Sequence, residues 1–420
     1  MPRPLAIAAL AVLAAALARP DGTTATSRTL WVRSEGQFSA AVSALRRTGG
    51  TIVLLPRVYR GTLVVPPRSG RRLRIVGRRG TRVERLLLDR AQDVTVGRLR
   101  IGPVTGDAWI EAVEARDVLL HDLVVSAAGT RYAATVLLPH SRRVTIRRSL
   151  FTHCGDRSPG FSNCLTLRRV RHLTVENNRF RDCRGCDFIH GRFGTNLTIR
   201  NNRLERALPC RMSRHRCGHQ DLVSIFAGSG LVVDNNYFGV YRSGGAQLYL
   251  TNNVDHVRIR NNLFVGTDPR VPRYRARVAM VIGSRESKRL PHHVRIVNNT
   301  ILTGTTRVDG YQGSIRMSSL YGRVPMAKRP ILANNVIGLL RVPNHVCSEL
   351  KASVSNIVLR GERCSKTDSV GAANLDGRGR PTAASSLLID AARGPYAPAR
   401  DITGRRRGGT PDIGAYEYPR

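Results

Sequence analysis

The chain has 420 residues and a formal net charge of +39, from 68 lysine and arginine residues against 29 aspartate and glutamate residues. A field this positive attracts polyanions. Aromatic residues make up only 5% of the chain and form no stacking pattern, which argues against a specific nucleic-acid binder. A high-GC genome explains arginine over lysine but not the shortage of acids. We therefore expect another acidic polymer as partner, with generic basicity as the alternative.

The first 20 residues have the three parts of a secretory signal peptide. Arg3 gives a basic start, an apolar run extends from Leu5 to Leu17, and Ala16-Leu17-Ala18 matches an A-x-A cleavage site. The run is too short to span a bilayer, and no other apolar run approaches that length. We expect residues 1–20 to be removed and the mature protein to be secreted, with no membrane insertion.

Residues 36–47 are the one segment with a helical pattern. Phe38, Val42 and Leu45 are spaced i, i+4, i+7 and therefore share one face of a helix. A short amphipathic helix of this kind can cover the open end of a β structure. Almost no other helix is expected.

A phrase of alternating apolar residues, then Asn-Asn, then a large apolar residue recurs through the middle of the chain. Clear copies begin at Leu173, Leu197, Leu231, Val257 and Val294, and weaker copies begin at Val94, Val118, Val144 and Pro330. Successive starts are separated by 24 to 37 residues. Such a period indicates a solenoid, in which each repeat buries its apolar edge against its neighbours.

Each copy contains a strand followed by a turn. Apolar residues alternate with a period of two, as at Leu173 and Val175, and Asn tolerates the positive φ of a tight turn. We expect stacked amides of the first Asn of each pair to form a ladder; these are Asn177, Asn201, Asn235, Asn261, Asn298 and Asn334. A second inward stack should contain Phe151, Phe180, Leu204, Phe238, Phe264, Ile301 and Ile337.

This pattern predicts an all-β fold, a single-stranded parallel β-helix with a short N-terminal capping helix, over residues 28–370. Each repeat has room for two or three short strands and contains no helical pattern. An antiparallel sandwich of hairpins is the alternative, but it would show turn signals every ~8–12 residues.

The strands before the repeat starts align when residues are counted back from those starts. Val136, Leu165, Ile189, Val223 and Tyr249 then share an inward position. Three neighbouring columns are expected to face solvent: Asn163, Asp187, Asp221, Gln247; Leu137, Thr166, His190, Ser224, Leu250; and Pro139, Arg168, Arg192, Phe226, Asn252.

The alignment predicts one polar patch of candidate catalytic residues, namely His190, Arg192, Arg168, Asp187 and Asp221. His219 and Asn163 are candidates for substrate binding beside them. Solvated ion pairs on a solenoid face are the alternative interpretation. His153 and Asp156, next to Cys154, are a lesser candidate that is more typical of a disulfide-held turn.

Eight cysteines, an even number, indicate disulfides and an oxidising compartment. Cys154 and Cys183 share a column on coils stacked about 4.8 Å apart, which favours bridges between coils. A local Cys183–Cys186 bridge is the competing arrangement, and a zinc site lacks a second C-x-x-C. The bridges expected are Cys154–Cys183, Cys164–Cys186, Cys210–Cys217 and Cys347–Cys364.

Three steps between repeats are longer than one lap, at residues 206–220, 266–277 and 303–323. The first two are rich in arginine, so we place the polyanion-binding surface on their side. From Gly371 the repeat is lost. Residues 371–420 are expected to wrap the last coil as a cap.

The phrases NLTIRNNRL and GLVVDNNYF resemble the repeats of the right-handed parallel β-helix proteins, the pectate-lyase-like superfamily. Phe38–Gly61 resembles the N-terminal cap of that group, and PDIGAYEY (Pro411–Tyr418) resembles a tail of secreted bacterial β-helix proteins. The resemblance implies a right-handed coil. We expect a monomer. Many members are polysaccharide lyases, with hydrolases and uronate epimerases beside them.

For an exported β-helix of this charge we expect an acidic polysaccharide, uronate-containing or sulfated, as substrate of a lyase-type β-elimination. That reaction needs a neutralised carboxylate, a base for the neighbouring proton and an acid for the leaving oxygen. Arg168 or Arg192, or a calcium ion held by Asp187 and Asp221, would neutralise the carboxylate. His190 would be the base.

The sequence departs from the catalytic patterns of the best-known members of this superfamily. The sequence lacks the dense Asp cluster of calcium-dependent pectate lyases and the Asn-Thr-Asp, Asp-Asp and Arg-Ile-Lys set of galacturonases. It establishes no cofactor. A non-catalytic glycan-binding or cell-envelope protein is the alternative function, beside a hydrolase or an epimerase.

Overall fold

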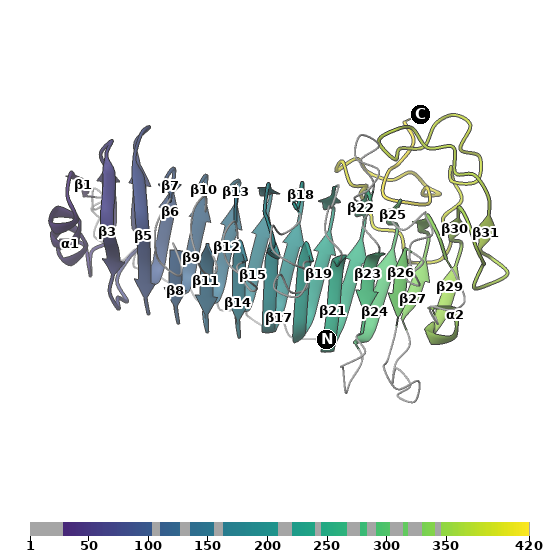
Figure 1. Ribbon diagram of the computed structural model, residues 1–420, viewed down its shortest axis with the longest axis horizontal. Helices are drawn as coiled ribbons and strands as arrows, with labels where there is room; N and C mark the ends of the chain where they lie inside the picture. Colours follow the sequence, from purple (N-terminus) through teal and green to yellow (C-terminus); the bar gives the residue numbers. More distant parts are fainter. Residues whose placement is uncertain are drawn as a thin grey trace, which may run out of the picture.

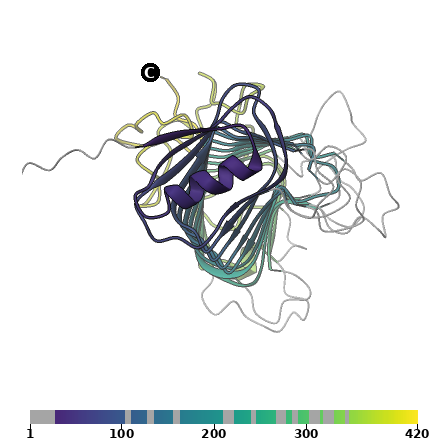
Figure 2. The ribbon, with the colours of Figure 1, turned by 90° about the vertical axis from the view of Figure 1, so that its left-hand side faces the viewer.

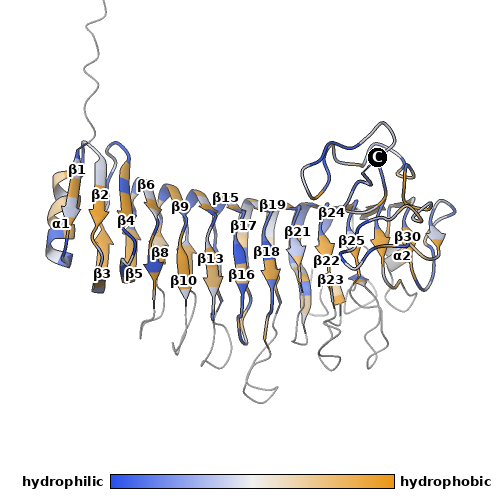
Figure 3. Ribbon diagram, turned by 90° about the horizontal axis from the view of Figure 1, so that it is seen from above, coloured by the Kyte–Doolittle hydropathy of each residue, from blue (hydrophilic) through white to orange (hydrophobic). Residues whose placement is uncertain are grey.

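The structure is a computed structural model that describes residues 28–102, 110–126, 135–154, 163–208, 221–239, 245–266, 278–283, 291–302, 314–317, 330–340 and 346–419. In these residues 31 strands pair in parallel and stack along one long axis (Figure 1). Each strand lies beside its counterpart in the next coil, and segments such as β2 (Gly50–Leu54) and β10 (Val124–Ser126) are strongly hydrophobic (Figure 3). The predicted parallel β-helix is confirmed.

The strands form three sheets. Sheet I contains β8 (Ile110–Val113), β11 (Val136–Pro139), β14 (Leu165–Arg168), β23 (Val278–Ile282), β26 (Ile315–Met317), the first parts of β17 (Ile189–Arg200), β19 (Val223–Asp234) and β21 (Ala246–Arg260), and the last parts of β3 (Val58–Val65) and β5 (Arg82–Asp89).

Sheet II follows sheet I in each coil and holds the repeat phrase. It contains the last parts of β17, β19 and β21, together with β1 (Thr29–Val32), β2 (Gly50–Leu54), β4 (Leu73–Gly77), β6 (Gln92–Gly97), β9 (Arg116–His121), β12 (Arg142–Arg147), β15 (Arg171–Glu176), β24 (His292–Val297), β27 (Ile331–Ala333) and β29 (Ala352–Val354).

Sheet III follows the Asn-Asn turn. It contains the first parts of β3 and β5, together with β7 (Arg100–Ile101), β10 (Val124–Ser126), β13 (Leu150–Thr152), β16 (Arg179–Arg181), β18 (Arg203–Glu205), β20 (Tyr237–Phe238), β22 (Leu263–Phe264), β25 (Thr300–Ile301), β28 (Val336–Ile337), β30 (Ile357–Val358) and β31 (Ser369–Val370).

The register predicted from the repeat is confirmed. Val118, Val144 and Leu173 pair one above the other in sheet II, and the later repeat starts continue the same column. The apolar stack after the turn is also present. Its rings Phe151 and Phe180 lie 4.6 Å apart at 8°. Repeats that are far apart in the sequence therefore contribute to one continuous buried core.

The two asparagines of each pair have different roles. The first adopts φ between 51° and 55°, as the turn prediction requires, but the prediction that it forms the ladder is wrong. Asn236, a second Asn, donates from Nδ2 to Oδ1 of Asn262 at 3.0 Å and to the Ile199 carbonyl at 2.8 Å. The positive φ of the first residue turns the second side chain into the core. The ladder runs through Asn178, Asn202, Asn236, Asn262, Asn299, Asn335 and Asn356.

Helix α1 (Glu35–Ala44) lies across the open end of the first coil (Figure 2). Ser34 caps it by accepting a hydrogen bond from the Gln37 N–H. Phe38, Val42 and Leu45 are buried, as their spacing predicts. Among the described residues, the other helix is the four-residue α2 (Val346–Glu349).

The disulfides between coils were predicted wrongly. Cys154 bridges Cys164, and Cys183 bridges Cys186, within their own coils. The stacked pair does not form, because each sulfur already bonds a cysteine nearer in the sequence; Cys183 Sγ lies 3.2 Å from the Cys154 carbonyl oxygen. The predicted Cys347–Cys364 bridge is present. Cys210 and Cys217 lie outside the described residues.

Residues 371–419 pack along the Asn turns of the last coils (Figure 1). The first asparagines of three pairs hold the segment: Nδ2 of Asn298, for example, donates to the Asp412 carbonyl at 3.0 Å. Gly414 has φ +97° and passes so close to Thr300 that a Cβ would lie 2.8 Å from Oγ1. Buried Arg407 pairs with Glu417 at 3.0 Å. The tail motif, Pro411–Tyr418, therefore holds the C-terminal segment against the Asn turns of the solenoid.

Candidate functional site

The candidates Arg168, His190 and Arg192 lie on the outer side of sheet I, on strands β14 and β17, which β19 follows. Asp187 and Asp221 come just before β17 and β19. The predicted register is confirmed over these strands, but Thr166 and Ser224, which were expected to face solvent, are buried, at 8% and 1% exposed. The strands pair Leu165 with Ile189 and Val223 inside, and Thr166 with His190 and Ser224, and Arg168 with Arg192 and Phe226, outside.

The alignment is wrong by one residue on β21. Val223 pairs with Leu248, so Tyr249 joins the outer column beside Ser224 instead of facing inward. The cause is an extra residue in the turn from sheet I to sheet II, where Asn252 and Asn253 both have positive φ. The same slip moves three other residues out of their predicted columns: Gln247, Leu250 and Asn252.

The column of Asn163, Asp187 and Asp221 was expected to face solvent, and this is wrong. The three residues are 7%, 7% and 2% exposed. Asp187 lies two residues before the inward Ile189, and strand alternation places both on one side. Asp187 Oδ1 accepts a hydrogen bond from the Asp221 N–H at 2.8 Å, and Asp221 Oδ1 accepts one from the Ala246 N–H at 2.7 Å. The column is a second polar ladder.

Asp187 nevertheless reaches the outer face through its other oxygen. Its Oδ2 lies 3.0 Å from Nδ1 of His190 and accepts the hydroxyl of Ser224. Arg192 donates from Nε to Nε2 of His190 at 3.3 Å. Because an arginine Nε–H only donates, Nε2 carries the lone pair and Nδ1 carries the proton. His190 therefore presents a basic nitrogen toward the side of the face where Arg192 lies.

An aromatic strip continues from His190 over the next two coils. The rings of His190 and Phe226 are 5.2 Å apart, and those of Phe226 and Tyr249 are 5.7 Å apart. The guanidinium of Arg192 lies 5.3 Å from the centre of the Phe226 ring, a cation–π distance. Phe193, at the edge of the strip, is 60% exposed. We name His190, Arg168, Arg192, Ser224, Phe226 and Tyr249 the His190 face.

No aromatic residue was among the predicted site residues, although Phe226 stood in a predicted outer column. In a chain with 5% aromatic residues, Phe226 and Phe193 near Arg192 were an available signal. The one-residue error on β21 placed Tyr249 in the inward column, so its position on the outer face was not predicted.

The predicted calcium ligands are already engaged by the protein. Both Asp187 oxygens accept hydrogen bonds, from the Asp221 N–H and from Ser224. Asp221 is 2% exposed and holds the Ala246 N–H. A calcium ion between these two carboxylates would have to displace these donors, so the pair fits the ion poorly. The exposed Arg168 and Arg192 are the cations that the His190 face itself offers.

Several described arginines on the solenoid pair with an acid one coil away. Examples are Arg200 with Glu176 at 2.6 Å and Arg260 with Asp234 at 2.8 Å. The column of Arg116, Arg142 and Arg171, in register on three strands of sheet II, has no such salt bridge within the described chain. Partial desolvation, followed by the charges of Arg116 and Arg143, lowers the pKa of Arg142. We name Arg116, Arg142 and Arg171 the arginine column.

Several predicted features lie outside the described residues. They are His219, Asp156 and most of the three long steps between repeats. His153 is described: its Nδ1 lies 2.9 Å from the Thr152 hydroxyl and its φ is 55°, as in a turn.

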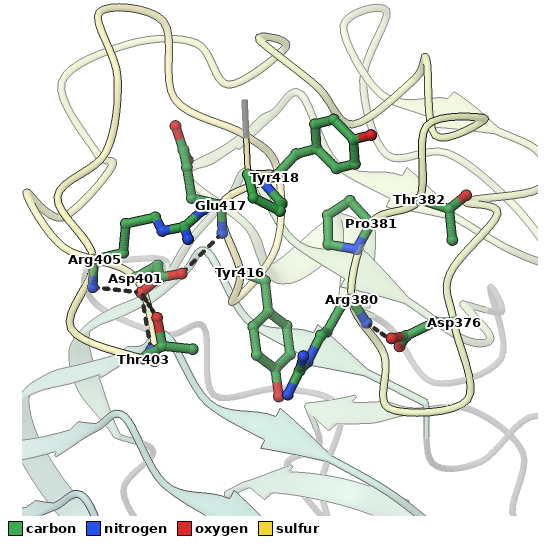
Figure 4. Close-up of a pocket in the computed structure, with 11 residues that line it drawn as sticks. Asp376, Arg380, Pro381, Thr382, Asp401, Thr403, Arg405, Tyr416, Glu417 and Tyr418 are labelled. Atoms are coloured by element: carbon green, nitrogen blue, oxygen red, sulfur yellow. Dashed lines mark hydrogen bonds between the residues drawn. The ribbon is translucent and has the colours of Figure 1, made fainter.

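A cavity of about 320 Å³ lies within the C-terminal segment (Figure 4). Arg380, Arg405 and Tyr416 line it. Two of its acids hold local turns. Asp376 Oδ1 accepts a hydrogen bond from the Arg380 N–H, and Asp401 Oδ1 accepts one from the Arg405 N–H. These contacts explain the cavity as part of the fold of the docked segment.

Comparison with known proteins supports the fold. Residues 117–264 match the family model described as a right handed beta helix region. A comparison with curated proteins found no match. Among the described residues, no helix is long and apolar enough to cross a membrane.

The solved structures that resemble this chain do so at low sequence identity and with TM-scores below 0.5. A xylose complex of XylC has 8% identity and a TM-score of 0.49, covering 80% of this chain and 67% of its own. A GH87 α-1,3-glucanase catalytic unit from Streptomyces thermodiastaticus has 12% identity and a TM-score of 0.48, and the match covers 87% of this chain and 70% of the glucanase chain. The PL6 family alginate lyase AlyGC has 13% identity and a TM-score of 0.42, and the match covers 92% of this chain and 58% of the lyase chain. These values concern the fold alone.

Proposed function

We propose that this protein acts on an acidic polysaccharide bound along the His190 face, by β-elimination beside a uronate. The observation that carries the proposal is the orientation of His190: Asp187 holds Nδ1 while Nε2 lies beside the Arg192 guanidinium. A base placed next to an exposed cation suits the abstraction of a proton adjacent to a carboxylate.

Each chemical requirement has a residue on this face. Arg192, helped by Arg168 one coil below, pairs with the uronate carboxylate and disperses the negative charge that develops there. Arg192 leaves His190 Nε2 when it pairs with the carboxylate, which frees the lone pair of that nitrogen. His190 then takes the neighbouring proton at Nε2, and Asp187 stabilises the imidazolium that forms. Tyr249 supplies the phenol that protonates the leaving oxygen. It follows Ser224 in the outer column, which puts it two coils from His190.

The shape of the face suits an extended polymer. Coils repeat about every 4.8 Å, so a chain laid along the axis meets equivalent positions on successive strands. Phe226 and Tyr249 offer apolar ring surfaces for sugar rings, and the arginines supply charge.

Hydrolysis is less well supported than elimination. Glycoside hydrolases ordinarily use two carboxyl groups that both contact the substrate. Asp187 and Asp221 are buried in a ladder, and Asp221 points its Oδ1 at a backbone N–H. Non-catalytic binding and epimerisation would use the same surface and are separated by experiment.

Export is part of the proposal. The bridges Cys154–Cys164, Cys183–Cys186 and Cys347–Cys364 fit an oxidising compartment. A secreted protein of this charge would meet acidic glycans outside the cell.

The test is to incubate the protein with a panel of uronate-containing and sulfated glycans, with calcium and with a chelator. Unsaturated products that absorb at short ultraviolet wavelengths establish elimination. New reducing ends without absorbance establish hydrolysis, and retention without cleavage establishes binding. If no polyanion is even retained, the proposal is wrong. Activity that survives the chelator supports arginine in place of calcium.

A further inference from the structure

A second cluster of side chains capable of binding a ligand lies away from the His190 face, in the turn that joins sheet I to sheet II. It contains Asp255 and His256 on β21 and His293 on β24, one coil further on. The ligand atoms of these three residues all lie within 4.8 Å of one another. They belong to two coils and were not singled out by the repeat pattern.

One carboxylate holds both imidazoles. Asp255 Oδ1 lies 2.7 Å from Nδ1 of His293, and Oδ2 lies 2.8 Å from Nδ1 of His256. The two rings stack with centres 4.4 Å apart at 25°. Two ring nitrogens and a carboxylate therefore converge on one small volume.

The backbone explains how the histidines meet. His256 and His293 occupy successive places in a column of residues with positive φ, at 52° and 49°. Parallel stacking sets such positions about 4.8 Å apart. In an earlier part of the same column Asp117 meets an arginine, Arg143, through two hydrogen bonds. At Asp255 the partners are imidazoles, which can lose a proton and become ligands.

Solvent reaches the cluster. The side chains of Asp255, His256 and His293 are 31%, 66% and 34% exposed. A fourth nitrogen lies close in the sequence and register: His292 pairs with Asp255, and its buried Nδ1 has no hydrogen-bond partner within the described chain. An ion bound by three protein groups would keep open positions for water.

We propose that Asp255, His256 and His293 form a binding site for a divalent transition-metal ion of the zinc class. Two imidazole nitrogens and one carboxylate oxygen match the ligand preference of Zn²⁺, Co²⁺, Ni²⁺ and Cu²⁺, whereas Ca²⁺ and Mg²⁺ prefer oxygen ligands alone. The ion replaces the protons on the two Nδ1 atoms. It links β21 to β24, so binding raises the stability of the folded solenoid.

The experiment is calorimetric titration of tag-free, chelator-treated protein with Zn²⁺ alone. His293→Ala and His256→Ala should each lose one bound zinc, or bind it at least about tenfold more weakly. The matched control is His172→Ala, because His172 has positive φ in the same column but contacts Asn196 instead of a carboxylate. It should keep the wild-type stoichiometry.

Two readouts separate loss of the site from loss of the fold. Circular dichroism of the metal-free variants should match the wild type, and Zn²⁺ should raise the melting temperature of wild type and His172→Ala by more than that of His293→Ala. Co²⁺ should give visible absorption bands that His293→Ala lacks. Equal zinc stoichiometry, affinity and thermal shift in wild type and His293→Ala would overturn the proposal, whatever the glycan assays show.

Discussion

The Nδ1 atom of His190 lies 3.0 Å from Oδ2 of Asp187, although Asp187 is buried and His190 belongs to the outer face of sheet I. Asp187 thus belongs both to the buried ladder and to the His190 face. Its Oδ1 extends the inner ladder, and its Oδ2 orients the imidazole. This link between core and surface fixes which nitrogen of His190 is basic.

The Asn ladder should contribute strongly to stability. Asn236→Ala removes three donations from Nδ2 and leaves the Asn202 N–H without its acceptor, at about 1–3 kcal/mol for each buried group left unpaired. Asn235→Gly, at the neighbouring position with φ 55°, should change the unfolding free energy little. Denaturant unfolding measures both. Equal losses would show that the second Asn has no special role.

The disulfide arrangement can be read by peptide mapping without reduction. The expected crosslinks are Cys154–Cys164 and Cys183–Cys186. The sulfurs are crowded, since Cys164 Sγ lies 3.3 Å from Cys183 Sγ. Recovery of Cys154 joined to Cys183 would contradict the structure at this point and restore the bridge between coils.

The repeat predicted sheets II and III because its signal is local: every copy carries its own Asn-Asn turn, and the strands on either side follow. Sheet I was predicted less well, because its register was counted across a turn whose length changes at Asn252 and Asn253. The burial of Asp187 could have been predicted, because Asp187 lies two residues before the inward Ile189 and alternate residues of a strand face the same side. The cysteine pairing was not, because four sulfurs meet in one place and spacing cannot choose among them.

The arginine column should make polyanion retention sensitive to salt. Replacing Arg142 with alanine removes the middle charge of three that lack acidic partners in the described chain, so the slope of log affinity against log salt should become shallower. Heparin chromatography and salt-dependent titration measure this. Arg200→Ala, which breaks a pair with Glu176, is the matched control and should alter the slope less. An unchanged slope in Arg142→Ala would exclude the column from binding.

Asp122 should make stability depend on pH. The hydrogen bond from Arg148 holds the pKa of Asp122 well below its usual value. The folded pKa is the lower one, so the stabilisation is present above the unfolded pKa of about 3.9 and is lost as pH falls through the folded value. The stability gap between wild type and Asp122→Asn, expected to be under about 1 kcal/mol for so exposed a pair, should be full at pH 7 and shrink below about pH 4. A gap independent of pH in thermal melts would refute this assignment.

The central claim is that His190 is the base on an acidic polysaccharide. Its most direct test is the rate of unsaturated product formation, on the glycan that the panel identifies, by wild type, His190→Ala and the control His172→Ala. His190→Ala should be slower by about 10²–10⁴-fold while its circular dichroism stays unchanged, and His172→Ala should keep the wild-type rate. A folded His190→Ala protein that forms unsaturated product at the wild-type rate would contradict the account.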